Sequence, residues 1–153
     1  MSTVAQVKVR LADILNNVAG LRKAYAYSPR SLPPTDLPAV LVFTGPARYD
    51  NVTLARGNMI LETRAYLLRL LVQPVAIGID GEAEMQVETF LRTIPAAVDD
   101  QLGLPHPTSG VELDYVQQVT ALGDNGIGVF VHNGDEYMGA EFRIEVETYV
   151  QKT

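Results

Sequence analysis

The spacing of apolar residues predicts a helix near the start of the chain. Over residues 3–19, aliphatic side chains recur at intervals of three and four residues, which places them on one helix face. Ser2 or Thr3 can cap the beginning of this helix, and Gly20 is a suitable residue for its end. The positions expected to face the core are Val4, Val7, Leu11, Ile14, Leu15 and Val18.

A second helix is predicted in the middle of the chain. Asp80 can cap it, and two glutamates follow in its first turn, where the helix dipole favours negative charge. The helical pattern runs to about Thr93, and Pro95 is expected to end the helix or to kink it because proline lacks an amide hydrogen. Its buried stripe is predicted to consist of Val87, Phe90, Leu91 and Ile94.

Strands account for most of the other apolar residues. A short buried strand is predicted over residues 39–44, and a much longer one begins at residue 59 and ends at Pro74. Residues 45–58 between them are predicted to be a long connection. Residues 20–38 contain four prolines and are predicted to be a loop without regular structure. Such long loops are often functional.

Three further strands are predicted after the second helix, at about residues 110–122, 127–133 and 136–151. Residues 123–126 form the first turn, and the pair Asn133-Gly134 is a strong hairpin signal for the second. The predicted element order is therefore α-β-β-α-β-β-β. This order indicates an α+β fold, with a mostly antiparallel sheet and two main helices packed on one face. The length of 153 residues suits a single domain, residues 1–153.

The long strand over residues 59–73 is apolar on both of its faces. Arg64 shares one face with Tyr66, Leu68, Leu70 and Val72, and Arg69 shares the other with Ala65, Leu67 and Leu71. The helices can cover only one face. The other would form an exposed apolar patch, which soluble monomers tend to avoid. Either a partner chain covers that patch, or the last three strands fold over it as a second layer.

Composition and charge narrow the classes of protein. Apolar residues make up 47% and charged residues 20% of the chain, as in globular proteins, and the absence of cysteine excludes disulfides and thiolate chemistry. Residues 1–79 hold nine Lys/Arg and four Asp/Glu, a formal charge of +5, whereas residues 80–153 hold three Lys/Arg and fourteen Asp/Glu, a formal charge of −11. Either the protein has surfaces of opposite sign, or the halves interleave and the asymmetry averages out.

No pattern in the sequence indicates catalysis or a cofactor. His132, Asp135 and Glu136 could ligate a metal, but one turn rarely supplies three converging ligands, so a solvated turn is expected. No glycine pattern matches a phosphate-binding loop, and no serine has the surroundings of a nucleophile. The acidic balance disfavours binding to a nucleic-acid backbone. No apolar run reaches the ~18 residues that span a bilayer, and the first residues do not resemble a secretory signal, so no membrane partner is expected.

Three stretches of the chain have a recognisable layout, namely "LPAVLVFTGPARYDNV", "TRAYLLRLLVQPVAIGIDGEAE" and "AEFRIEVETYV". After the predicted N-terminal helix, they give a long arginine-containing strand, a helix led by glycine and acids, and an alternating last strand. This layout, over about residues 1–150, resembles that of the tail-terminator, or tail-completion, proteins and related neck proteins of long-tailed bacteriophages.

The resemblance implies a structural virion protein without catalytic residues, metal or cofactor. The resemblance implies that such a protein forms a hexameric ring on the last tier of the tail tube. It ends tube polymerisation and binds the head-side connector protein, and DNA only passes through its lumen. The implied partners are thus other copies of this chain, the tail tube protein and the connector protein. The implied location is the tail or neck of the virion, which is assembled in the host cytoplasm.

Several residues are predicted to serve these contacts. The subunit or ring interface is predicted to involve Arg48, Arg56, Arg64, Arg69, Tyr25 and Tyr27. Their acidic partners, or the lining of the lumen, are predicted to be Glu141, Glu145 and Glu147. Two alternatives remain open. One is a head-closure or other neck protein, and the other is a small α+β ligand-binding or enzyme domain whose pocket the sequence does not reveal.

Overall fold

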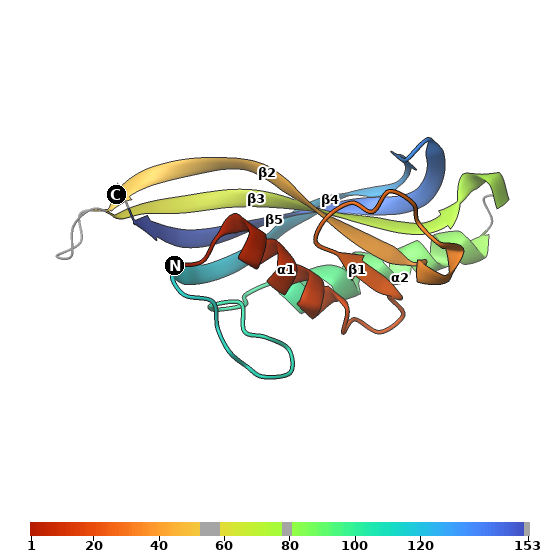
Figure 1. Ribbon diagram of the computed structural model, residues 1–153. Helices are drawn as coiled ribbons and strands as arrows, with labels where there is room; N and C mark the ends of the chain where they lie inside the picture. Colours follow the sequence, from red (N-terminus) through yellow and green to blue (C-terminus); the bar gives the residue numbers. More distant parts are fainter. Residues whose placement is uncertain (53–58, 78–80, 152–153) are drawn as a thin grey trace.

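The computed structural model describes residues 1–52, 59–77 and 81–151. Its architecture is α+β, with two helices and a five-stranded, mostly antiparallel sheet (Figure 1). The predicted class and the packing of both helices on one face are therefore confirmed. The elements are α1 (Val4–Leu15), β1 (Lys23–Tyr25), β2 (Ala39–Val52), β3 (Met59–Pro74), α2 (Gly81–Val98), β4 (Val116–His132) and β5 (Asp135–Gln151). The predicted helix cap Asp80 lies outside the described residues.

The element order is α-β-β-β-α-β-β, which differs from the predicted order at two places. The loop over residues 20–38 contains the short strand β1, which pairs in parallel with the first residues of β2. The predicted turn at residues 123–126 is not a turn between strands. It is an irregularity inside the single long strand β4, where the pairing with β5 shifts between Asp124 and Ile127. Glycine and aspartate there form a β-bulge, a feature that has the same composition as a turn.

Both predicted helices form, with different ends. The side chain of Thr3 accepts a hydrogen bond from the amide of Gln6, and the side chain of Gln6 accepts one from the amide of Thr3, which is a complete capping box. The helix α1 ends at Leu15, earlier than predicted. In contrast, α2 continues through Pro95 to Val98. Ile94 and Val98 are both fully buried, and their packing on the sheet outweighs the hydrogen bond that Pro95 cannot donate.

The strand β2 runs far beyond the predicted residues 39–44 and includes most of the predicted connection. Gly45 and Pro46 lie in a β-bulge between Thr44 and Ala47, after which β2 pairs with β3 again. Proline is tolerated there because this part of β2 is an edge of the sheet, as β1 pairs only with Ala39, Val40 and Leu41.

The sheet has the strand order β1-β2-β3-β5-β4. Figure 1 shows that it is long and twisted, with α1 and α2 against one side and the ends of β2, β3 and β5 extending past the helices. We call the side with the helices the helix face and the other side the open face. The β4–β5 turn, at Asn133 and Gly134, lies at the opposite end of the sheet from the last residues of β2 and the first residues of β3.

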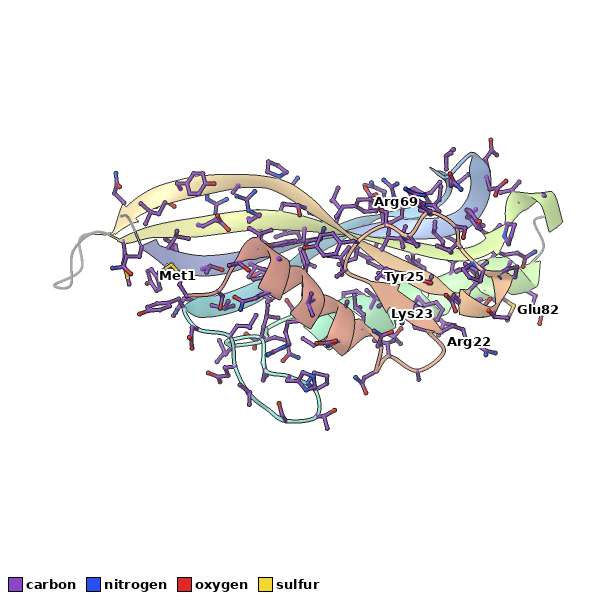
Figure 2. All side chains as sticks on the ribbon, in the orientation of Figure 1. Met1, Arg22, Lys23, Tyr25, Arg69 and Glu82 are labelled. Atoms are coloured by element: carbon purple, nitrogen blue, oxygen red, sulfur yellow. The ribbon has the colours of Figure 1, made fainter. Side chains whose placement is uncertain are left out.

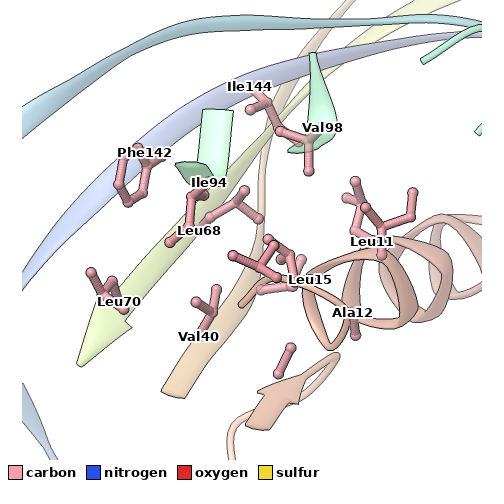
Figure 3. Close-up of a cluster of buried hydrophobic side chains, with 14 of the residues drawn as sticks. Leu11, Ala12, Leu15, Val40, Leu68, Leu70, Ile94, Val98, Phe142 and Ile144 are labelled. Carbon is pink, nitrogen blue, oxygen red and sulfur yellow. The ribbon is translucent and has the colours of Figure 1, made fainter. Parts of the chain in front are cut away.

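The main core lies between the helix face and the two helices (Figure 3). Leu11 and Leu15 of α1 and Ile94 of α2 are fully buried and pack against the strands. The strand β3 contributes the series that begins with Tyr66, and burial raises the pKa of the Tyr66 phenol above its usual value. The strand residues of this core include Val40, Val42, Leu68, Leu70, Val72, Phe142, Ile144 and Val146.

The second apolar face of β3 is covered in part by the chain itself. A smaller cluster on the open face contains Leu32 from the loop after β1, Leu71 of β3 and Tyr137 of β5. Neither a second layer of strands nor a partner is needed at this end of the sheet. The cluster ends near Leu67, which is half-buried, so only part of the predicted patch remains open.

Candidate functional site

Arg69, a predicted interface residue, is held within its own chain. Its Nε and Nη2 atoms lie 2.9 and 2.8 Å from Oε2 of Glu141 on the neighbouring strand. Its guanidinium also lies over two aromatic rings, 4.7 Å from the centre of Phe43 and 5.2 Å from that of Phe130. Arg69 thus connects β2, β3, β5 and β4 on the open face. Arg69 thus pairs with one of the three predicted glutamates inside its own chain, whereas the prediction was a pair between subunits.

Arg64 lies on the helix face, beyond the helices, and it too has partners in its own chain. It donates to the Glu62 carboxylate at 3.2 Å, to the carbonyl oxygen of Gly45 at 3.0 Å and to the phenol oxygen of Tyr49 at 3.0 Å. The hydrogen bond to Glu62 raises the pKa of Arg64, so this guanidinium is charged at every physiological pH. Its contacts fasten β3 to the bulge in β2.

Arg48 is the predicted interface arginine with the most exposed side chain in the described part of the chain. Its side chain is 66% exposed, and Nη1 lies 3.8 Å from Oε1 of Glu145. A pair this long and this open contributes little to stability. Glu147 lies next to it on the open face, opposite Thr63 of β3. Arg56 lies outside the described residues.

The two predicted interface tyrosines have different surroundings. Tyr25 is half-buried against the open-face cluster, and its hydroxyl donates to Oδ2 of Asp36. Tyr27 is 57% exposed, with the ammonium of Lys8 4.2 Å from the centre of its ring. Lys8 is itself buried, and burial lowers its pKa. Tyr25, labelled in Figure 2, therefore fastens the loop to the sheet, whereas Tyr27 remains exposed for a contact.

The hydrogen bond between Tyr25 and Asp36 predicts a change of stability at alkaline pH. Burial and this bond raise the pKa of Tyr25 from its ordinary value of 10.0 to about 12. A raised folded-state pKa favours the neutral phenol, so this stabilisation is complete below pH ~10 and is lost as the pH rises towards about 12. We expect the free energy of unfolding to fall less steeply in this window in Tyr25→Phe than in the wild type. Urea titrations at several pH values measure this, and Tyr27→Phe should behave as the wild type does.

The outer edge of β4 is covered along only part of its length. The connection from α2 covers its first part, where the amide of Asp100 donates to Val119 at 2.9 Å and that of Gly103 donates to Gln117 at 3.2 Å. Beyond the bulge, β5 is the only strand of the described residues that pairs with Ile127–Val131. Sequence reasoning missed this edge because it divided β4 in two and treated its halves as separate short strands.

Acidic and basic side chains lie at opposite edges of the sheet. The stretch from residue 93 to residue 142 contains eight Asp/Glu and no Lys/Arg. Exposed members of this stretch lie along β4 and its turn, namely Asp99, Asp100, Asp124, Asp135 and Glu136. The exposed basic residues Arg22 and Lys23 lie at β1, the other end of the strand order. Acidic side chains therefore predominate along β4, where Arg143 of β5 also stands opposite Gly123, and two exposed basic side chains lie at β1.

The surface also has open depressions. The one of about 720 Å³ lies where α1, α2 and residues 105–110 meet, and His106 is the only ionisable residue among those that line it. His106 Nε2 lies 3.8 Å from the Asp13 carboxylate. The turn after His132 was predicted to be solvated. Asp135 and Glu136 are exposed there, but His132 is half-buried, and its Nε2 contacts the carbonyl oxygen of Pro29 at 2.9 Å. The described residues contain no cluster of three metal-ligating side chains.

No helix in the described part of the chain is long and apolar enough to span a membrane. The chain matches no protein-family model, and no curated protein matches it. Its function is therefore argued from the sheet, its two edges and the residues on its open face.

Proposed function

We propose that this chain is a structural virion protein that forms a hexameric ring at the end of a phage tail tube. The ring stops further polymerisation of the tube and binds the head-side connector. Among its own residues, the observation that supports the proposal best is the opposite charge of the two edges of the sheet. A molecule with complementary sides associates head to tail, and such heterologous contacts close into rings or run on as fibres.

The layout of the fold is consistent with this role. Two helices cover one face of a long sheet, and the strands β2, β3 and β5 extend beyond them as an arm. The arm carries exposed charged residues, including Arg48, and offers a contact surface outside the core. The excess of acidic residues would keep DNA moving through the lumen, because like charge repels the phosphates.

Solution mass and electron microscopy test the ring directly. The purified chain is examined alone and after mixing with the tail tube protein. A closed species of several copies, seated on the end of tubes, is the expected result. A chain that stays monomeric at high concentration and does not bind tubes would contradict the proposal.

Deletion of the gene separates a terminator from another neck protein. Loss of a terminator leaves tubes of abnormal length, because nothing stops their growth. Loss of a head-closure or connector protein leaves tails of normal length without heads. Normal tails would therefore contradict the terminator role and would favour the neck alternative.

Arg48→Glu is the matched test of the arginines on the arm. Arg64→Glu or Arg69→Glu would break contacts within the chain, so a loss of assembly in those variants would not identify an interface. Because Arg48 is 66% exposed and its ion pair is long, we expect Arg48→Glu to change the free energy of unfolding by less than about 0.5 kcal/mol. We expect it to weaken assembly, measured by sedimentation. Unchanged assembly would remove Arg48 from the interface.

A further inference from the structure

The open part of the β4 edge carries an exposed apolar strip. Ile127, Val129 and Val131 are 37%, 49% and 60% exposed. They alternate along the strand and therefore share one face, on the same side as Met138 and Ala140, which stand opposite them in β5 and belong to the main core. We call these three residues the β4 strip. It continues the helix face beyond the cover that the helices provide.

Within residues 127–131, the β4 edge itself carries none of the devices that normally protect a sheet edge, although a bulge with Asp124 lies directly before it. Natural edges carry charged residues, prolines or bulges that prevent association. The free part of β2 has all of these, in Pro46, Arg48, Asp50 and its bulge. Residues 127–131 have neither charge nor proline. An unprotected apolar edge of this kind is typical of a surface that another chain covers.

The charge beside the β4 strip indicates the nature of its partner. Asp124 lies in the bulge before it, and Asp135 and Glu136 lie in the turn after it, all three of them exposed. Arg143 of β5 pairs with Gly123 and lines the same depression as Asp124, so the excess of negative charge lies at Asp135 and Glu136. The complementary surface at this turn is therefore basic, with apolar or aromatic side chains that can cover the strip.

The opposite edge of the same molecule has this character. Arg22 and Lys23 are exposed at β1, and neither forms an ion pair with another described residue. Tyr27, 57% exposed, follows two residues after β1. We call Arg22, Lys23 and Tyr27 the β1 patch, and Figure 2 labels its two basic members. Arginine and tyrosine are enriched at the centres of protein interfaces.

The β1 patch must act through side chains and not by adding a strand. The side chain of Asn16 occupies the outer backbone groups of Ala24, since Oδ1 accepts from its amide at 2.8 Å and Nδ2 donates to its carbonyl oxygen at 3.4 Å. This capping closes β1 to further strand pairing. Arg22 and Lys23 beside it are exposed and can reach a neighbour, and the Lys23 ammonium lies 5.8 Å from the centre of the Tyr25 ring.

The β1 patch and the β4 strip lie at the same level of the sheet. The register can be followed from one edge to the other, through Lys23, Ala39, Leu71, Gly139 and Gly128. Copies that repeat around an axis along the strands would therefore bring Lys23 of one molecule beside Gly128 of the next without sliding. The two surfaces match in charge and in apolar character, and they lie at the same level along the strands.

We infer that the β4 strip receives the β1 patch of a second copy of this chain. Tyr27 covers the strip, and Arg22 and Lys23 face Asp135 and Glu136 of the neighbour. The inference rests on the ring proposed above and identifies the surfaces that close it. Each copy uses both edges, so the contact is heterologous and repeats from one subunit to the next.

Charge exchange tests this contact. Lys23→Glu and Glu136→Lys should each weaken association by about tenfold, because each places like charges together. The double variant should restore association to within about threefold of the wild type, because it restores one attraction across the interface. Sedimentation measures association, and circular dichroism confirms that each exposed substitution leaves the fold intact.

Cross-linking tests the register and benefits from the absence of native cysteine. In Lys23→Cys/Gly128→Cys, a short bis-maleimide should join neighbours into a ladder that ends at the size of the closed ring. The new side chain fits at Gly128, where a Cβ would lie 3.7 Å from the Phe130 ring. The matched control is Lys23→Cys/Gln118→Cys, on the covered part of β4, which should give no ladder.

The outcomes separate this contact from the ring itself. Rings that form without the ladder and without charge rescue would overturn the contact and leave the ring proposal intact. A ladder in a chain that never binds tubes would support the contact and contradict the terminator role. If the single variant Gly128→Cys is cross-linked into dimers without a cysteine at position 23, two β4 edges pair symmetrically. That result would overturn the inference. Absence of both ladder and oligomer would overturn both proposals.

Discussion

Replacing Gly139 by alanine is expected to destabilise the protein by about 4 kcal/mol or more, which is most of the stability of an ordinary domain. Gly139 is buried in β5, opposite Leu71 at the shift in the pairing with β3. A Cβ built on Gly139 would lie 1.7 Å from the carbonyl oxygen of Leu70 and 2.8 Å from its carbon. These are backbone atoms, so no side-chain rotation relieves the overlap. The two central strands would have to separate and lose part of their hydrogen-bond ladder.

Gly128→Ala is the matched control for this prediction. Gly128 stands opposite Gly139 in the sheet, on β4, and a Cβ there would make only an ordinary contact of 3.7 Å with the Phe130 ring. Because alanine restricts the unfolded chain more than glycine does, this variant should be neutral or up to about 1 kcal/mol more stable. Urea unfolding followed by circular dichroism measures both. Equal midpoints for Gly139→Ala and the wild type would contradict the close approach of β5 to β3.

Most of the fold was predictable because its elements are strongly periodic. The capping box at Thr3, the long strand that ends at Pro74 and the hairpin at Asn133-Gly134 all follow local rules that the structure obeys. The errors occurred where tertiary packing outweighs those rules. Pro95 remains inside α2 because Ile94 and Val98 are buried, and Pro46 remains inside β2 because its edge is free. The strand β1 has only three residues and depends on its pairing with β2.

The candidate site was less predictable, because partners on a sheet depend on register. The sequence suggested that arginines pair with glutamates of the last strand, and Arg69 does pair with Glu141. It could not show that the pair lies within one chain, because that depends on β5 being the neighbour of β3. The exposure of the β4 strip depends in the same way on which strand lies last in the sheet. Its alternating Ile127, Val129 and Val131 were visible in the sequence, but an alternating strand is usually half-buried.

Removal of the Arg69 side chain is the second large effect that we expect. Its guanidinium bonds to a carboxylate whose side chain is only 14% exposed and stacks on Phe43 and Phe130. Arg69→Ala leaves the partly buried Glu141 carboxylate without this partner. It also removes the contacts of the guanidinium with the Phe43 and Phe130 rings. Loss of one partner of a fully buried pair costs about 3–5 kcal/mol, and the Arg69 side chain is 28% exposed, so we expect about 2–3 kcal/mol. Urea unfolding measures the loss.

A double-mutant cycle separates the ion pair from the stacking. Arg69→Ala combined with Glu141→Ala should cost less than the sum of the two single changes by about 1–2 kcal/mol, because the second change removes the unpaired charge that the first one leaves. Arg48→Ala with Glu145→Ala provides the control on the same face, where a pair 3.8 Å long should couple by less than about 0.5 kcal/mol. Equal coupling in the two cycles would contradict a structural role for the Arg69 pair.

The same variants also decide what Arg69 does in an assembly. If it only joins the strands, Arg69→Ala lowers the unfolding midpoint while the folded fraction still associates at low temperature as the wild type does. If the neighbour also contacts it, association falls even where the chain is fully folded. The contacts of Arg69 with β2, β4 and β5 favour the first result, because they already engage its charge and both sides of its guanidinium within one chain. Sedimentation at a temperature well below the unfolding midpoint distinguishes the two.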